Sequence, residues 1–422
     1  MQKITPGSLQ PRQRAGKRTS AIFSRIVWIK AGIWDIFNDI LYVDCRRMDI
    51  PFFKQISLSK GLALFKKKPP SVLGVDLGSS SLKMVQVRKE NERALLETYG
   101  ELASGPYGGL EVGKSVRLVA DKVQEMIADL MKESNATSRR AVVAVPLRSS
   151  FVTMISMPLM SEADLKEAVP FEARRWIPVP AGEVILDWWV LPQGVGGEEN
   201  REEGFAKEKK FMDVLLVAIH REVVEKYREI FGKVGIEVAS FEIEVFSQVR
   251  SALWREVAPV LLVDFGASAT RFTIVDYGIV RMSHGVDKGS QDLTLSLSRS
   301  LGIDFERAEK MKREIGLSDR PEHKETKGLI EPILDSVFSE GLRVVAQYRR
   351  KSGHSIKRVF LAGSGANLKG LGDFCINKFG AEAKLAQPFG RLSYPVFLES
   401  SLAELGPTFA TALGAALREL QE

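Results

Sequence analysis

Two segments of the chain share a pattern of residues that could bind phosphate. Each is an apolar run that ends in Asp-x-Gly, followed by small residues and then an alternating run that contains one basic residue. Glycine allows a tight turn and a close approach to a phosphate, and successive backbone N–H groups in such a turn form an anion-binding concavity. An Asp at the end of a buried strand can hold Mg²⁺ or its water shell. The first segment offers Gly78, Ser79, Ser80, Ser81 and Lys83 for phosphate and Asp76 for the metal, and the second offers Gly266, Ala267 and Ser268 with Asp264.

The two segments, residues 73–87 and 261–275, match each other at a constant offset of 188 residues. An apolar run, a turn and an alternating run predict a β-hairpin in each case. A hairpin duplicated over this distance predicts two similar domains in one chain. Facing hairpins would hold the β- and γ-phosphates of a nucleotide from opposite sides; the alternative is two ordinary hairpins with tight turns.

A third segment adds a glycine-rich turn. Residues 358–362 form an apolar run, the turn Gly363-Ser364-Gly365 follows it, and a helix is expected to begin near Leu368. Glycines at such a turn let the flat face of a base or ribose lie on the backbone. Alone, this segment is a generic strand–loop–helix connection.

The order of these three motifs resembles the actin/Hsp70/sugar-kinase superfamily. The resemblance implies an α/β class, with a duplicated actin-like (ribonuclease H-like) ATPase fold, and it implies ATP and Mg²⁺ as ligands. Residues 242–250 and 407–416 resemble the two linking helices of the superfamily, and the small residues of the second would allow close helix packing. Hydrolysis needs a polar residue that positions the attacking water, and Glu244 is the candidate by position, with Glu242 an equal alternative.

Within that superfamily the chain is similar to the PilM family of actin-like type IV pilus assembly proteins, over residues 72–420. The similarity is carried by residues 157–180 and 183–187, which resemble the Ser-Glu-x-x-Leu helix start, the Phe-Glu-Ala core and the Ile-Pro-x-Pro exit of that family. It implies a cytoplasmic protein at the inner face of the membrane that is at most a slow ATPase. The implied partner is the cytoplasmic tail of a PilN-like inner-membrane protein, and self-association is a further expectation.

Three alternatives stay open at this point. FtsA-like cell-division proteins share the fold but end in an amphipathic membrane-targeting helix, and the chain ending at Glu422 favours the PilM family. An ATP-hydrolysing or phosphotransfer enzyme of the same fold would show steady turnover. A scaffold that binds no nucleotide would tolerate the loss of Asp76 and Asp264.

The family comparison also predicts an interaction domain inserted into the first lobe. Its elements are expected to be strands over 150–155, 184–191, 211–219 and 236–241 and helices over 162–176 and 221–231, with Ser161 and Asp164 capping the first helix and Pro170 kinking it. The groove that receives the partner's tail is expected around residues 171–179.

The predicted division of the whole chain is an N-terminal extension (1–70), a first lobe (71–149), the inserted α+β domain (150–241), a linking helix (242–257), a second lobe (258–400) and a closing helix (401–422).

One rival motif predicts a different site. Residues 108–115 match the P-loop pattern, and residues 259–264 could serve as its second strand. A P-loop needs a buried strand that runs straight into the loop, whereas Pro106 is unsuited to a central strand, and the rival leaves the repeat unexplained. We therefore expect Gly113-Lys114-Ser115 to open a helix over 116–132.

Composition excludes several other classes of protein. Fourteen of the 60 basic residues and four of the 53 acidic residues lie before Ser71, so the rest of the chain is nearly neutral and carries no argument for nucleic-acid binding. Charged residues interrupt the apolar stretch 21–43, which argues against a membrane span. The extension is either a basic segment that contacts lipid, or it is disordered or lies upstream of the true start of the protein. We favour the second interpretation. The scattered Cys and His residues fit no metal or redox spacing.

Overall fold

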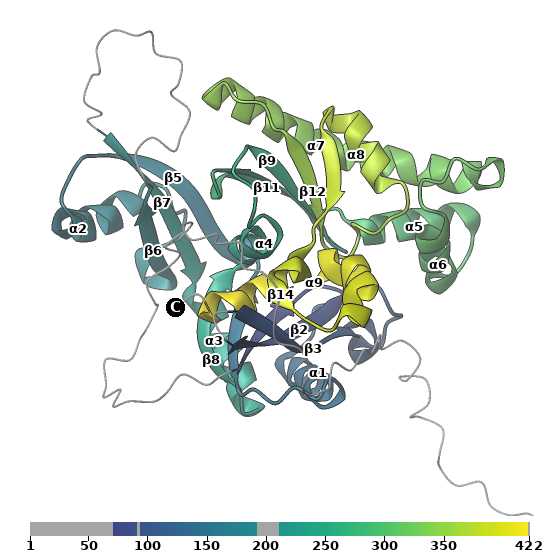
Figure 1. Ribbon diagram of the computed structural model, residues 1–422, viewed down its shortest axis with the longest axis horizontal. Helices are drawn as coiled ribbons and strands as arrows, with labels where there is room; N and C mark the ends of the chain where they lie inside the picture. The colour runs from purple at the N-terminus through teal and green to yellow at the C-terminus, as the bar shows by residue number, and fades with distance from the viewer. Residues whose placement is uncertain (1–70, 91–92, 192–210, 421–422) are drawn as a thin grey trace, which may run out of the picture.

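The computed structural model describes residues 71–90, 93–191 and 211–420. The predicted N-terminal extension and residues 194–210, whose Gly, Glu and Lys content predicts a loop between two strands of the inserted domain, lie outside the described residues. Within the described part of the chain, three sheets are covered by helices (Figure 1). Two of the sheets form two lobes, and the third belongs to a smaller unit at one side of the molecule.

The first lobe contains a six-stranded sheet in the order β14-β3-β2-β1-β4-β8. Successive side chains of β1 point to opposite faces of this sheet. Leu73 and Val75 pack with helix α1 on one face, and Val72 packs with helix α9 on the other. The elements are β1 (Ser71–Leu77), β2 (Ser81–Glu90), β3 (Arg93–Ala103), α1 (Ala120–Glu133), β4 (Arg140–Val145), α3 (Arg221–Lys233), β8 (Glu237–Ile243) and β14 (Leu392–Ser393).

Four predictions for the first lobe were wrong. Strand β8, expected in the inserted domain, pairs in parallel with β4 in the first sheet, because its alternating pattern predicts a strand but not the sheet that it joins. Helix α3, also expected in the inserted domain, packs into the core of the first lobe. Strand β14, expected in the second lobe, pairs in parallel with β3. The helix expected from residue 116 begins only at Ala120. The backbone N–H groups of Ser115 and Val116 are instead bonded to the Gln291 side chain and the Ser79 carbonyl, which holds this segment extended.

The second lobe repeats the core of the first. Its sheet has the order β11-β10-β9-β12-β13, and strand β9 pairs antiparallel with β10 and parallel with β12, as β1 does with β2 and β4. Asp76 lies opposite Lys83 across the first hairpin, and Asp264 lies opposite Arg271 across the second. Both predicted hairpins are therefore confirmed. The elements are β9 (Val260–Phe265), β10 (Thr270–Asp276), β11 (Ile279–Val286), α5 (Ser290–Leu301), α6 (Phe305–Ile315), α7 (Lys324–Ser352), β12 (Arg358–Ala362), α8 (Leu371–Phe379) and β13 (Glu382–Leu385).

The smaller unit is a three-stranded antiparallel sheet, β5-β7-β6, with one helix. One face of β7 packs on that helix, and the other face joins the core of the first lobe. The Ser161 hydroxyl and the Asp164 carboxylate form the predicted capping box, and the helix contains Pro170 but ends at Ala173, earlier than expected. The elements are β5 (Ser150–Pro158), α2 (Glu162–Ala173), β6 (Val184–Val190) and β7 (Phe211–His220).

Two helices link the lobes: α4 (Glu244–Ala252) and α9 (Glu399–Leu420). They lie at the centre of the molecule, with α9 drawn in yellow (Figure 1). A Cβ on Gly414 would lie 1.8 Å from the carbonyl oxygen of Ser247, and one on Gly74 would lie 1.9 Å from that of Ala412. The close packing predicted from the small residues of α9 is therefore confirmed.

Candidate functional site

The turns of the two hairpins meet where the lobes face each other. The Ser268 hydroxyl donates to the Ser79 hydroxyl at 2.8 Å, and the Ser115 hydroxyl lies 3.3 Å from Ser79. The Ser79 and Ser80 carbonyls accept from the N–H groups of Val116 and Ser104, which fixes the shape of the first turn. The phosphate-binding candidates Gly78 to Ser81 and Gly266 to Ser268 are thus brought together.

The first aspartate lies beside a lysine of its own hairpin. Lys83 Nζ is 3.8 Å from both Asp76 Oδ2 and Glu101 Oε1, and it donates to the Ser81 hydroxyl at 2.9 Å. Burial raises the pKa of Asp76 above its ordinary value, an effect that Lys83 opposes and Asp264 reinforces. A divalent cation would offset this cost by stabilising the ionised carboxylate.

The second aspartate is more fully engaged. Asp264 Oδ2 accepts from Gln248 Nε2 at 2.9 Å and lies 3.7 Å from Arg271 Nη1. Its Oδ1 atom lies against Gly363, where a Cβ would approach to 2.4 Å. The structure therefore distinguishes two carboxylates that the repeat treats as equivalent: Asp76 fits a metal better than Asp264 does.

Glu244 and Glu242, equal candidates in the sequence, lie in different surroundings. Glu244 Oε1 is 2.6 Å from Arg271 Nη1 and accepts from the Leu147 N–H at 2.7 Å. The pKa of Glu244 is raised to about 7, mainly by burial; Arg271 opposes the rise, and Asp264 and Asp76 contribute to it. Glu244 therefore shares an electrostatic environment with both aspartates.

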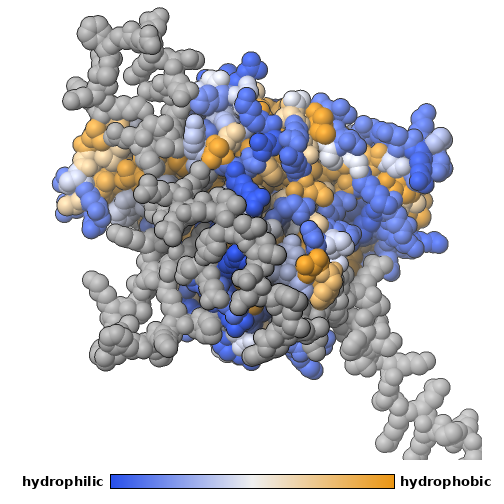
Figure 2. Space-filling model, viewed as in Figure 1, coloured by the Kyte–Doolittle hydropathy of each residue, from blue (hydrophilic) through white to orange (hydrophobic). Residues whose placement is uncertain are grey.

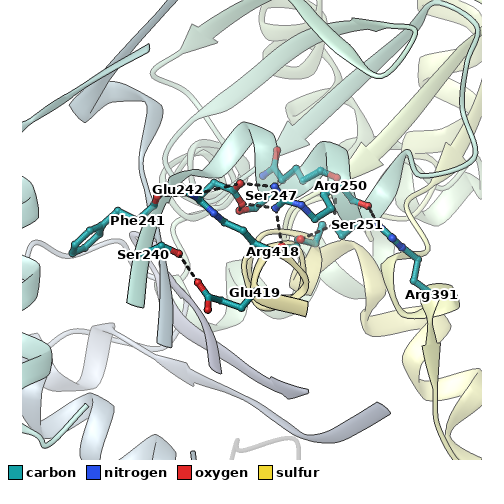
Figure 3. A network of polar contacts seen from close by, with 12 residues as sticks. Ser240, Phe241, Glu242, Ser247, Arg250, Ser251, Arg391, Arg418 and Glu419 are labelled. Atoms are coloured by element: carbon teal, nitrogen blue, oxygen red, sulfur yellow. Dashed lines mark hydrogen bonds and ion pairs between the residues drawn. The ribbon is translucent and has the colours of Figure 1, made fainter. Parts of the chain in front are cut away.

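Glu242 belongs to a buried ion-pair network at the crossing of α4 and α9 (Figure 3). Arg250 donates to both of its carboxylate oxygens, at 2.5 and 2.6 Å, and Arg418 lies 3.8 Å away. Burial alone would raise the pKa of Glu242, but Arg250 and Arg418 outweigh it, so the pKa lies below its ordinary value. These partners belong to α4 and α9, so Glu242 joins the two linking helices and is not part of the site.

The glycine-rich turn lies next to Asp264. Gly363 has φ +86°, a conformation that favours glycine, and its N–H donates to the Pro407 carbonyl at 2.8 Å. The N–H of Gly365 donates to the Phe265 carbonyl, also at 2.8 Å, and Ser364 between them is exposed. The two hairpin turns and the glycine-rich turn therefore lie close together, where the two lobes face each other.

The residues of the rival P-loop motif do not have P-loop geometry. Strand β3 ends at Ala103, and a 3₁₀ helix (Gly105–Gly108) follows before the loop. Lys114 is paired with Glu111 at 2.8 Å, and its ammonium lies 5.0 Å from the ring centroid of Phe305 in the second lobe. This loop connects the lobes instead of enclosing a phosphate.

Sequence reasoning missed several residues that complete the site: Glu101, Gln248, Gln291 and Ser115. Gln248 Nε2 also donates to Thr411 Oγ1 at 2.9 Å, so it joins Asp264 to helix α9. The Gln291 side chain accepts from the Ser115 N–H at 2.5 Å across the lobes. Ser115 belongs to the rival P-loop pattern and Gln248 to the first linking helix, but neither pattern indicates the contact that the residue makes here, because all four roles depend on contacts across the fold.

Comparison with known proteins agrees with this arrangement. Residues 74–420 match a family model described as "Type IV pilus assembly protein PilM". A solved structure entitled "PilM-PilN type IV pilus biogenesis complex" is 25% identical with a TM-score of 0.68, covering 83% of this chain and 99% of that chain. These two findings confirm the predicted actin-like α/β fold.

Two more distant structures are also similar to the chain. The ethanolamine utilization protein EutJ from Carboxydothermus hydrogenoformans is 15% identical, with a TM-score of 0.47 over 83% of this chain and 91% of that one. MreB5 of Spiroplasma citri, bound to ADP, is 12% identical, with a TM-score of 0.47 over 83% of this chain and 97% of that one.

Proposed function

The chain belongs to the PilM family of type IV pilus assembly proteins, and from this premise we propose that it binds Mg-ATP between its lobes and is recruited to the inner membrane by a partner's cytoplasmic tail. The observation that carries the nucleotide part is the meeting of the two turns, at a contact of 2.8 Å between Ser268 and Ser79. The lobes are those delimited in the sequence, except that helix α3 and strands β8 and β14 belong to the first lobe. ATP would favour the closed arrangement of the lobes and so shift the population of the partner-binding state.

In this proposal each motif has one task. The turn residues Gly78 to Ser81 and Gly266 to Ser268, with Lys83, bind the β- and γ-phosphates through N–H, hydroxyl and ammonium donors. Gly363 to Gly365 lie along the adenosine. Asp76 is the main metal residue and Asp264 a secondary one, and the bound Mg²⁺ supplies charge neutralisation between the phosphates.

The partner is proposed from the matched structure, whose title pairs PilM with PilN. The surface that fits an extended tail peptide lies on the inserted unit, where Phe171 is 68% exposed and Trp176 is 48% exposed. Hydrophobic residues gather over α2 at the left end of the molecule (Figure 2). Trp188 and Trp189 instead pack into the cores on opposite faces of this sheet.

Binding to an inner-membrane partner would bring the protein to the membrane, where the proposed function requires it. Among the described residues, helices fall short of the length and apolar character that crossing a bilayer requires. From the family match we propose a cytoplasmic location at the inner face of the membrane. Slow turnover of ATP is the secondary proposal, favoured by a pKa of about 7 at Glu244, which suits a general base near neutral pH.

A single titration tests this function. A labelled synthetic peptide with the sequence of the PilN-like tail is titrated with the full chain, with and without Mg-ATP, and its fluorescence anisotropy is followed. We expect binding that Mg-ATP strengthens. Absence of binding in both conditions would contradict the partner proposal, and equal affinities would contradict the nucleotide dependence.

A further inference from the structure

The basic residues of the two hairpins make unequal contacts. Lys83 approaches Asp76 no closer than 3.8 Å. Arg271, its counterpart in the repeat, lies 2.6 Å from Glu244 and 3.7 Å from Asp264. These carboxylates come from different elements, the start of α4 and the end of β9, so the guanidinium bridges a linking helix and the second lobe.

One oxygen of each bridged carboxylate is already engaged. Asp264 Oδ2 accepts from Gln248, and Glu244 Oε1 accepts from the Leu147 N–H, so a metal would compete with these bonds and with Arg271 for the same two oxygens. The three bridged side chains are 12–14% exposed, so bulk water screens them little. Mg²⁺ needs ligand oxygens at about 2.0–2.1 Å in octahedral geometry, and a guanidinium at the same oxygens opposes it by charge repulsion.

We propose that Arg271 is an internal cation that occupies the position of a metal contact between Asp264 and Glu244, so that the site retains ATP with its metal on the Asp76 side and turns it over slowly. This inference rests on the proposed nucleotide binding. Arg271 acts through the two carboxylates and is therefore a positioning residue.

The chemistry that Arg271 would suppress is ordinary hydrolysis. A water oxygen forms a bond to the γ-phosphorus while the bond from that phosphorus to the β–γ bridging oxygen breaks, and ADP leaves with the electron pair of that bond. The proton of the water must pass to a base, and Glu244 is the candidate. The guanidinium of Arg271 beside Glu244 Oε1 lowers the pKa of this carboxylate and so makes Glu244 a weaker acceptor for the proton.

The test replaces the cation by a neutral side chain of similar reach. ATP affinity is measured by calorimetry with and without Mg²⁺, and phosphate release is followed separately, for wild type, Arg271→Gln and the double variant Arg271→Gln/Glu244→Gln. Removing one positive charge beside the metal should increase the effect of Mg²⁺ on ATP affinity about tenfold, and phosphate release should rise about tenfold. In the double variant, which lacks the base, phosphate release should fall to the wild-type level or below it while ATP still binds.

Each other outcome has a defined meaning. Arg271→Gln with unchanged magnesium dependence and unchanged phosphate release would overturn the inference, as would fast release in the double variant. If Arg271→Gln does not unfold cooperatively, Arg271→Lys replaces it: one ammonium reaches one carboxylate, so a smaller increase in magnesium dependence is expected, and no increase overturns the inference. Wild type that binds no ATP with or without Mg²⁺ would instead contradict the proposed function.

Discussion

The hydroxyl of Ser268 donates to that of Ser79 at 2.8 Å although 189 residues separate them in the chain. Each serine lies in the turn that follows a strand ending near an aspartate. A phosphate group cannot fit between two oxygens at hydrogen-bonding distance, so a bound nucleotide must replace this contact with its own oxygens. In the proposed function, the phosphate oxygens would therefore link the two turns in place of this single hydrogen bond.

The two aspartates should respond differently to substitution. Asp76→Ala should weaken Mg-ATP binding at least about tenfold, about 1.4 kcal/mol, with little effect in the absence of magnesium, because Asp76 has the less engaged carboxylate. Asp264→Ala should change the magnesium dependence less but lower the melting temperature more, because Gln248 and Arg271 lose a partner. Calorimetry and thermal unfolding of both variants make the comparison. Unchanged affinity in Asp76→Ala would show that the metal assignment is wrong.

The crossing of the linking helices should tolerate no added methyl group. Gly414→Ala would place a Cβ 1.8 Å from the Ser247 carbonyl oxygen, a backbone atom that cannot rotate away, and should cost about 3 kcal/mol of unfolding free energy. Gly328→Ala is the matched control, because Gly328 lies in helix α7 with no atom within 4 Å of its added Cβ. That change should stabilise the protein by about 0.5–1 kcal/mol. Equal effects of the two variants in chemical denaturation would rule out close packing of α4 and α9.

Glu244 should make stability depend on pH. Its pKa is raised to about 7 in the folded protein from an ordinary value of 4.5, so between these values the folded state holds the proton more tightly than the unfolded state does. The contribution to stability is therefore complete below about pH 4.5 and is lost as pH rises through about 7. Wild type should lose more unfolding free energy between about pH 5 and about pH 8 than Glu244→Gln does. Glu331→Gln, at an exposed position of α7, should follow wild type, and parallel curves for all three proteins would contradict the prediction.

Local patterns predicted the hairpins because their signals are short-range, whereas the linking helices were predicted from the resemblance to the superfamily. Alternating side chains and Asp-x-Gly turns each determine structure within about ten residues. The position of β8 could not be predicted, since an alternating strand fits either neighbouring sheet. The unequal surroundings of Asp76 and Asp264 could not be predicted either, because they depend on Gln248 of α4 and on Arg271, whose nearest carboxylate belongs to another element.

The proposed docking surface can be tested without removing the inserted unit. Deletion of that unit is unsuitable, because one face of β7 belongs to the core of the first lobe and would be exposed. A point substitution avoids this problem: Phe171 is 68% exposed, so Phe171→Ser should leave the fold intact. It should weaken tail-peptide binding at least about tenfold, because an exposed aromatic side chain at the centre of a peptide site contributes most of its affinity.

The control for this test replaces the same type of exposed side chain at a position outside the inserted unit. Phe397 is 65% exposed in the short helix Val396–Leu398 before α9, so Phe397→Ser removes an aromatic ring of equal exposure outside the inserted unit. Both variants should unfold at nearly the wild-type temperature, and only Phe171→Ser should lose affinity in the anisotropy titration. If the two variants bind the tail peptide equally well, residues 171–179 do not form the docking surface. If Phe397→Ser alone loses affinity, the peptide binds beside the start of α9 instead.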